Sequence, residues 1–138
     1  GGTMRDPGLT EASVTIDGAD VRWLASAVIP SPFRHGFTGR MGGPPGGDFS
    51  DATRNPANRP AVLANRARLE RAMAGTLHVV TQVHGRAVHR VRATDVPSAT
   101  VAREADASWT DDAGVLLAVF VADCVPLVFA DPVTGACG

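Results

Sequence analysis

The chain has 138 residues, of which 44% are hydrophobic and 20% charged, and its formal net charge is −1. This composition predicts one globular domain, and the near-zero charge excludes the global positive field that attracts nucleic acid or anionic membranes. Lysine is absent, which excludes mechanisms that depend on a Schiff-base or P-loop lysine.

No apolar run reaches the roughly 20 residues that cross a bilayer, and the N-terminal sequence lacks the layout of a signal peptide. We therefore predict a cytoplasmic protein that binds neither membrane nor nucleic acid. The two cysteines, Cys124 and Cys137, are too few for a disulfide framework, so Cys124 is interpreted as a free thiol.

The first half of the chain contains a hairpin signal, a loop and a helical pattern. Residues 12–16 and 21–27 are strand-like and flank Asp17-Gly18, which predicts a β-hairpin. Residues 31–60 are rich in Gly, Pro, Asn and Asp and predict a long loop of the kind that often carries function. Residues 60–74 predict an amphipathic helix that ends at Gly75. Its apolar positions are Val62, Leu63, Ala67, Leu69 and Met73.

The second half predicts strands at about 77–83 and 87–92, a turn at 112–114, and a turn at 131–135. The unbroken apolar run Val115–Cys124 predicts a buried strand, and 127–130 predicts another. No internal repeat or linker is present. The simplest interpretation is a single α+β domain over residues 1–138.

Polar residues follow two of the apolar runs, and they predict one shared site. Gln82-Val83-His84-Gly85 ends one run, and Asp123-Cys124 ends the other. Gly85 would let the backbone turn beside the imidazole. The alternatives are a solvated or core histidine and a small buried cysteine, and His78 and His89, inside predicted strands, are interpreted as structural.

Asp123 limits the chemistry that Cys124 can perform. A neighbouring carboxylate raises a thiol pKa and does not favour a simple cysteine hydrolase. A metal ion removes this difficulty, because thiolate and imidazole are good zinc ligands and three protein ligands leave an open position for chemistry.

Several segments together resemble the YfiH-like laccase-domain family over about residues 21–138. They are Gln82–Gly85, Ala105–Ala107 with Thr110, Ala122–Pro126, Asp131-Pro132 with Gly135, His35–Phe37 with Arg40 and Gly42-Gly43, and Ala64–Arg66. The resemblance implies a layered α/β sandwich with a mixed sheet and flanking helices. The loop after Gly43 departs from the family pattern, which leaves substrate preference open.

The resemblance also implies a zinc site made of His84, Cys124 and a later histidine. That histidine belongs to a family segment that would begin just after Gly138. We therefore expect the chain to be an N-terminal fragment of a longer domain, with the site completed by the remaining segment or by a second copy.

Members of this family are linked to polyphenol oxidation, purine nucleoside phosphorolysis, adenosine deamination and peptidoglycan editing. A laccase needs a type 1 copper and a trinuclear cluster, which the chain's four histidines cannot supply, so copper is disfavoured. A single zinc suits deamination at the C6 of adenine. Phosphorolysis needs an anion grip, and Arg40 either provides it or braces its loop.

The leading hypothesis is a zinc-dependent purine nucleoside phosphorylase with adenosine deaminase activity, acting on adenosine, inosine, guanosine or methylthioadenosine with phosphate. Cys124, His84 and Asp123 would form the catalytic centre, with Asp123 orienting a ligand or water, and Arg40, Gln82 and His35 would bind substrate or phosphate. The alternatives are a cysteine-type hydrolase or peptidoglycan-editing factor with Cys124 as nucleophile, a laccase-like polyphenol oxidase, and an inert fragment or binding module.

Overall fold

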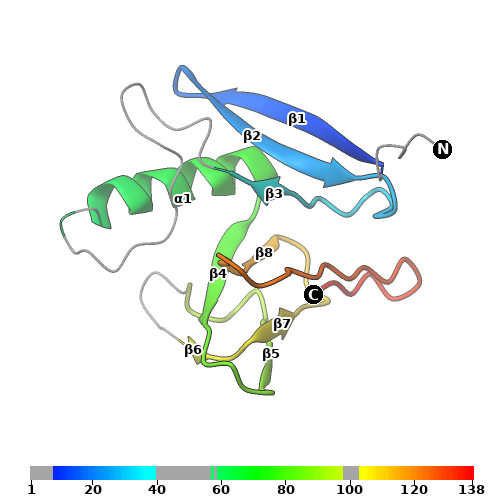
Figure 1. Cartoon of the computed structure of the whole chain (residues 1–138). Helices are drawn as coiled ribbons and strands as arrows, with labels where there is room; N and C mark the ends of the chain where they lie inside the picture. Colours follow the sequence, from blue (N-terminus) through cyan, green and yellow to red (C-terminus); the bar gives the residue numbers. More distant parts are fainter. Residues whose placement is uncertain (1–7, 40–56, 58, 98–102) are drawn as a thin grey trace, which may run out of the picture. The chain divides into compact units, whose positions relative to one another are not determined.

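The computed structural model describes residues 8–39, 57, 59–97 and 103–138, and Figure 1 shows its helix and strands. The chain divides into two compact units, Gly1–Ala72 and Met73–Gly138. Mixed strands and a helix confirm the predicted α+β class. Within the described ranges, no helix combines the length and apolar character that a bilayer span needs.

The first unit opens with the predicted hairpin. Strands β1 (Leu9–Ile16) and β2 (Ala19–Ser26) pair antiparallel along their whole length, from Leu9 opposite Ser26 to Ile16 opposite Ala19. Both turn residues are left-handed, with φ of 52° at Asp17 and 77° at Gly18, as a two-residue type I′ turn requires. The short strand β3 (Phe37–Thr38) pairs with the other edge of β2.

Helix α1 (Arg59–Met73) confirms the predicted helix, but its buried face differs from the predicted one. Its buried positions share the 3- and 4-residue spacing of one helical face: Val62, Asn65, Leu69 and Met73. Leu63 and Ala67 lie outside this face and are exposed, so Asn65 takes a place that an apolar residue was expected to fill. Arg71 and Asp17 form an exposed ion pair of 2.5 Å between α1 and the hairpin turn.

The helix ends differently from the prediction. Ala74, with φ of 53°, is the left-handed residue after α1, a conformation that Gly75 was expected to supply. A Cβ on Gly75 would lie 3.1 Å from Leu116 Cβ and 3.2 Å from the Gly114 carbonyl oxygen. Gly75 therefore serves close packing between neighbouring strands.

A parallel sheet organises the second unit. Strand β4 (Thr76–Thr81) lies between β6 (Arg103–Glu104) and β8 (Val115–Ala118), and both neighbours run parallel to it. Strands β5 (Val88–Arg90) and β7 (Ala107–Trp109) form a second parallel pair. The buried apolar side chains of this unit include Leu77, Val80, Val91 and Ala105.

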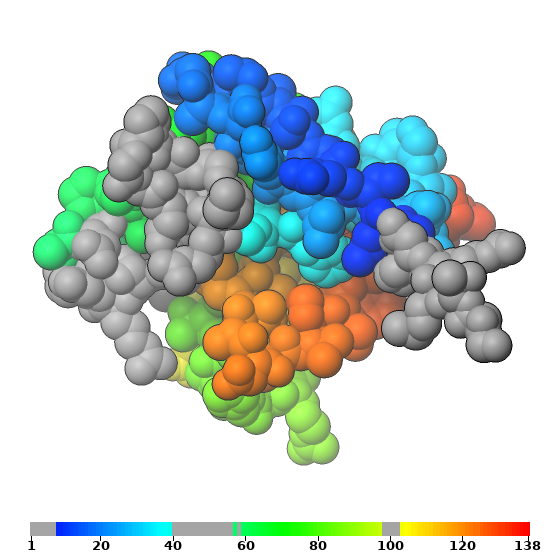
Figure 2. All heavy atoms as spheres, turned by 45° about the horizontal axis from the view of Figure 1, so that its top comes forward, coloured from blue at the N-terminus to red at the C-terminus, as the bar shows by residue number. Residues whose placement is uncertain are grey.

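The predicted long buried strand Val115–Cys124 is wrong in length and in burial. Pairing between β8 and β4 stops at Ala118, and the four residues of β8 are only half-buried. In the described part of the chain β8 has a strand neighbour on one edge only, so nothing extends the ladder beyond Ala118. Residues after it are largely exposed, including Val125 at 82%, and Figure 2 shows this segment in orange at the surface.

The predicted strand at 127–130 reduces to one bridge, because Ala130 pairs with Cys137 while Leu127 and Val128 stay exposed. The predicted turn at 131–135 is confirmed. Asp131 accepts hydrogen bonds from the Val133 N–H at 2.9 Å and the Thr134 hydroxyl at 2.8 Å.

Candidate functional site

Each motif of the second unit follows one strand of the three-stranded parallel sheet. Gln82–Gly85 follows β4, Ala105-Asp106 follows β6, and the segment that leads to Asp123-Cys124 follows β8. Carboxyl ends of parallel strands meet at one edge of a sheet, where ligands bind in open α/β sheets. The fold therefore brings the other two motifs to the two sides of the loop after β4, which is the Gln82–Gly85 motif itself.

The backbone of this loop is unusual at His84. Its φ is 58°, a left-handed conformation that is uncommon for residues other than glycine. A methyl group on Gly85 would lie 3.6 Å from the nearest Asp106 carboxylate oxygen, an ordinary contact distance. The turn that was attributed to Gly85 is therefore made by His84.

Asp106 binds this loop with both carboxylate oxygens. Oδ1 accepts the backbone N–H of His84 and Oδ2 accepts that of Gly85, each at 2.8 Å. Hydrogen bonds from backbone N–H groups, that of Gly85 foremost, lower the pKa of the Asp106 carboxyl below its ordinary range. Asp106 is thus an ionised acceptor at neutral pH.

The predicted site residues did not include Asp106, although it lies in a matching segment. The available signal was an acid between two alanines directly after a short strand, where small neighbours leave the carboxylate free to reach another loop.

Cys124 lies beside the first residue of the same loop. The side-chain amide Nε2 of Gln82 is 3.9 Å from Cys124 Sγ, within the range of an N–H to sulfur hydrogen bond. Cys124 is an exposed free thiol, and Asp123 next to it is also exposed. The structure therefore brings Gln82 of one predicted motif to Cys124 of the other.

The donor types suit a metal, but their number is small. Thiolate and imidazole are zinc ligands, and catalytic zinc sites use three protein ligands. Among residues 8–39, 57, 59–97 and 103–138, no group of three or more His, Cys, Asp or Glu side chains is placed to hold an ion. His84 and Cys124 would therefore need a further ligand from outside these residues.

In the first unit, His35 is engaged with the backbone of β2. Its Nε2 accepts the N–H of Ser26 at 2.8 Å, which places the ring proton on Nδ1, a buried atom that has no hydrogen-bond partner among the described residues. This hydrogen bond holds the backbone just before β3 against the end of β2. Arg40, the predicted phosphate ligand, lies outside the described residues.

Gly36 follows His35 and packs against an aromatic ring. A Cβ at this position would lie 2.5 Å from Cδ1 and 2.7 Å from Cγ of Trp23. Only a residue without a side chain fits this approach. The resemblance of His35–Phe37 to a family loop thus coincides with a steric requirement for glycine.

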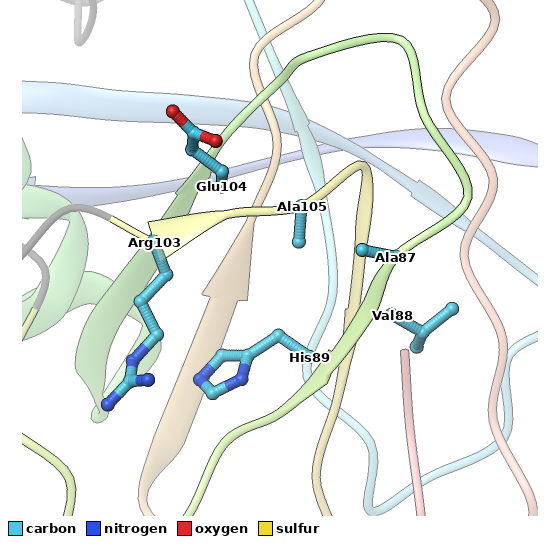
Figure 3. Close-up of a pocket in the computed structure, with 6 residues that line it drawn as sticks. All are labelled: Ala87, Val88, His89, Arg103, Glu104 and Ala105. Atoms are coloured by element: carbon cyan, nitrogen blue, oxygen red, sulfur yellow. The ribbon is translucent and has the colours of Figure 1, made fainter.

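A hollow of about 390 Å³ lies elsewhere in the second unit, between β5 and β6. Figure 3 shows His89 and Arg103 extending on one side of it while Glu104 points away. The charges of Arg103 and His89 contribute, after the Arg92 backbone N–H, to the lowered pKa of Asp95. The Arg103 guanidinium therefore has an internal counter-charge, and none of the predicted site residues lines the hollow.

The relatives found by comparison with known proteins are all named purine nucleoside phosphorylase. A purine nucleoside phosphorylase of Deinococcus radiodurans is 39% identical over 110 residues, which cover 75% of this chain and 41% of that protein. The purine nucleoside phosphorylase YlmD of Geobacillus stearothermophilus is 35% identical over 114 residues, 75% of this chain and 42% of its own. Human purine nucleoside phosphorylase LACC1 is 31% identical over 121 residues, 83% of this chain and 27% of its own.

The chain thus spans less than half the length of these curated relatives. No solved structure gives a significant match. The family model described as multi-copper polyphenol oxidoreductase laccase matches residues 34–138, so the chain belongs to this laccase-domain family, as its motifs predicted.

Proposed function

We propose that the protein containing this chain is a zinc-dependent purine nucleoside phosphorylase with adenosine deaminase activity. The contact between Gln82 and Cys124 carries the proposal, because it joins the Gln-Val-His-Gly and Ala-Asp-Cys segments at one place. Relatives that are 31–39% identical and named purine nucleoside phosphorylase support the reaction class.

His84 and Cys124 would hold the zinc together with a ligand from outside the described residues. When bound, zinc would supply Lewis-acid chemistry, which can activate water for deamination or polarise an atom of the nucleoside. The Gln82 amide would orient the Cys124 sulfur through its N–H to sulfur contact, and the exposed Asp123 would orient a ligand or a water molecule.

Phosphorolysis also requires recognition of phosphate. We assign this role to Arg40, whose guanidinium matches phosphate geometry with paired N–H donors. With its Nε2 occupied by the Ser26 N–H and its Nδ1 buried, His35 would hold the backbone that leads into β3 and would not contact phosphate itself. Deamination of adenosine would use the same centre with water in place of phosphate, so that the C6 amino group leaves as ammonia and inosine is formed.

The first test compares two cysteine variants of the whole protein. Cys124→Ala should lose bound zinc, phosphate-dependent release of adenine or hypoxanthine, and phosphate-independent conversion of adenosine to inosine. Cys137→Ala is the matched control, because Cys137 pairs with Thr110 through backbone atoms that the change keeps. Retained zinc and retained base release in Cys124→Ala would refute the assignment.

Metal analysis separates the remaining candidates in the same preparations. About one zinc per chain supports the proposal, whereas several copper ions per chain with oxidation of phenols would establish the oxidase instead. Turnover by metal-free protein that alkylation of Cys124 abolishes would establish a cysteine-type hydrolase.

A further inference from the structure

Asp106 has a contact that the proposed function does not use. Each of its carboxylate oxygens accepts the N–H of a consecutive residue, His84 and then Gly85, which lie 22 and 21 positions earlier in the chain. A carboxylate that accepts two adjacent backbone N–H groups fixes the orientation of both peptide planes. The planes concerned are those on either side of the His84 Cα.

The conformation that Asp106 holds is one that histidine does not favour. His84 has φ of 58°, and the left-handed region costs an L-residue about 1–2 kcal/mol. His84 and Gly85 are both exposed, so without Asp106 their N–H groups could bond to water in many other backbone conformations. Strain of this kind persists when surrounding contacts impose it, and it is common at functional sites.

Asp106 itself is anchored. Its N–H donates to the Ala87 carbonyl at 3.2 Å, and the preceding Ala105 is 1% exposed and donates to the Thr81 carbonyl at 3.1 Å. Ser108, two residues later, is buried in β7. The Asp106 carboxylate therefore fixes the loop after β4 relative to the sheet.

We infer that Asp106 is a positioning residue of the proposed site. By fixing the left-handed backbone of His84, it fixes the direction of the Cα–Cβ bond and so the region that the imidazole can reach. This inference rests on the proposed function, in which His84 is a metal ligand. Groups that orient metal ligands typically change metal affinity or activity by about 10–100-fold when removed.

The test uses Asp106→Asn in the whole protein. Asparagine keeps one acceptor oxygen and places an NH₂ group where the second acceptor stood. Asp112→Asn is the matched control, because the Asp112 carboxylate also accepts a backbone N–H from a distant residue, Ala93, at 2.8 Å. The readouts are the apparent zinc affinity in chelator competition, the kcat and KM for phosphorolysis, and the midpoint of thermal unfolding.

We expect the zinc affinity or kcat to fall about 10–100-fold in Asp106→Asn and to stay near the wild-type value in Asp112→Asn. The two variants should lose similar amounts of thermal stability. Equal zinc affinity and kcat in the two variants would overturn the positioning role while the proposed function stands. A wild-type protein with neither zinc nor phosphorolysis would overturn the proposed function, and the positioning role with it.

Amide hydrogen exchange of the wild-type protein tests the underlying contact even if Asp106→Asn fails to fold. The His84 and Gly85 amides should exchange slowly although both residues are exposed, since each donates to Asp106. Fast exchange at both amides would overturn the inference, whatever the enzyme's activity.

Discussion

The left-handed backbone of His84 makes a prediction about stability that is independent of catalysis. Replacing His84 by alanine or by glycine removes the same imidazole, but only alanine keeps a Cβ in a backbone with φ of 58°. The left-handed conformation costs alanine about 1–2 kcal/mol. The greater freedom of glycine in the unfolded chain offsets about 0.5–1 kcal/mol of this difference. His84→Gly should therefore be more stable than His84→Ala by about 0.5–1 kcal/mol.

Thermal and urea unfolding of the metal-free protein measure this difference without a contribution from zinc binding. At about 2–4 °C for each kcal/mol, the expected gap in Tm is about 1–4 °C. His89 provides a control with the opposite sign, because it lies in β5, where glycine should be less stable than alanine by about 0.5–1 kcal/mol. A gap at His84 of the same sign as at His89 would show that His84 is not left-handed in the native protein.

Three further outcomes are expected. Gly36→Ala should destabilise the protein by about 1–3 kcal/mol in urea unfolding, because the new Cβ would overlap Trp23. Gly39→Ala is the control and should change the stability little, since no atom lies within 4 Å of a Cβ at that position. Equal effects of the two changes would contradict the packing at Gly36. Iodoacetamide should modify the exposed Cys124 of the metal-free protein before Cys137, whose pKa is raised by burial, and peptide mass spectrometry that finds the reverse order would refute this exposure difference. The Arg90 guanidinium lowers the pKa of the Asp111 carboxyl in the folded protein. The contribution of the Arg90–Asp111 pair to folding stability should therefore be complete above the pKa of Asp111 in the unfolded chain, about 3.9, and should be lost as the pH falls through its lower pKa in the folded protein. Asp111→Asn should reduce the acid dependence of the urea midpoint, and an unchanged dependence would exclude this contribution.

The elements that the sequence predicts well are those determined by neighbouring residues. The hairpin depends on two consecutive left-handed positions, Asp17 and Gly18, and α1 depends on a local 3- and 4-residue spacing of buried positions. Both signals lie within a few residues of the element that they specify.

The features that the sequence did not predict depend on distant partners. The run Val115–Cys124 has the composition of a buried strand, but its length as a strand depends on how far β4 pairs with it, and that pairing stops at Ala118. Likewise, Asp106 looks like any loop acid until the fold brings it to His84, 22 positions away. Composition along one segment contains no information about either partner.

The order of the parallel sheet explains why the shared direction of its strands matters more to the proposed site than their length. Because β4 lies between β6 and β8, the loop after β4 is reached from one side by Asp106 and from the other by Cys124. Asp106 contacts the backbone of the loop, whereas Cys124 contacts the side chain of Gln82, so one neighbour fixes conformation and the other contributes a reactive atom. Even a β8 of four residues suffices for this arrangement, since it needs only to start the following segment at the correct edge of the sheet.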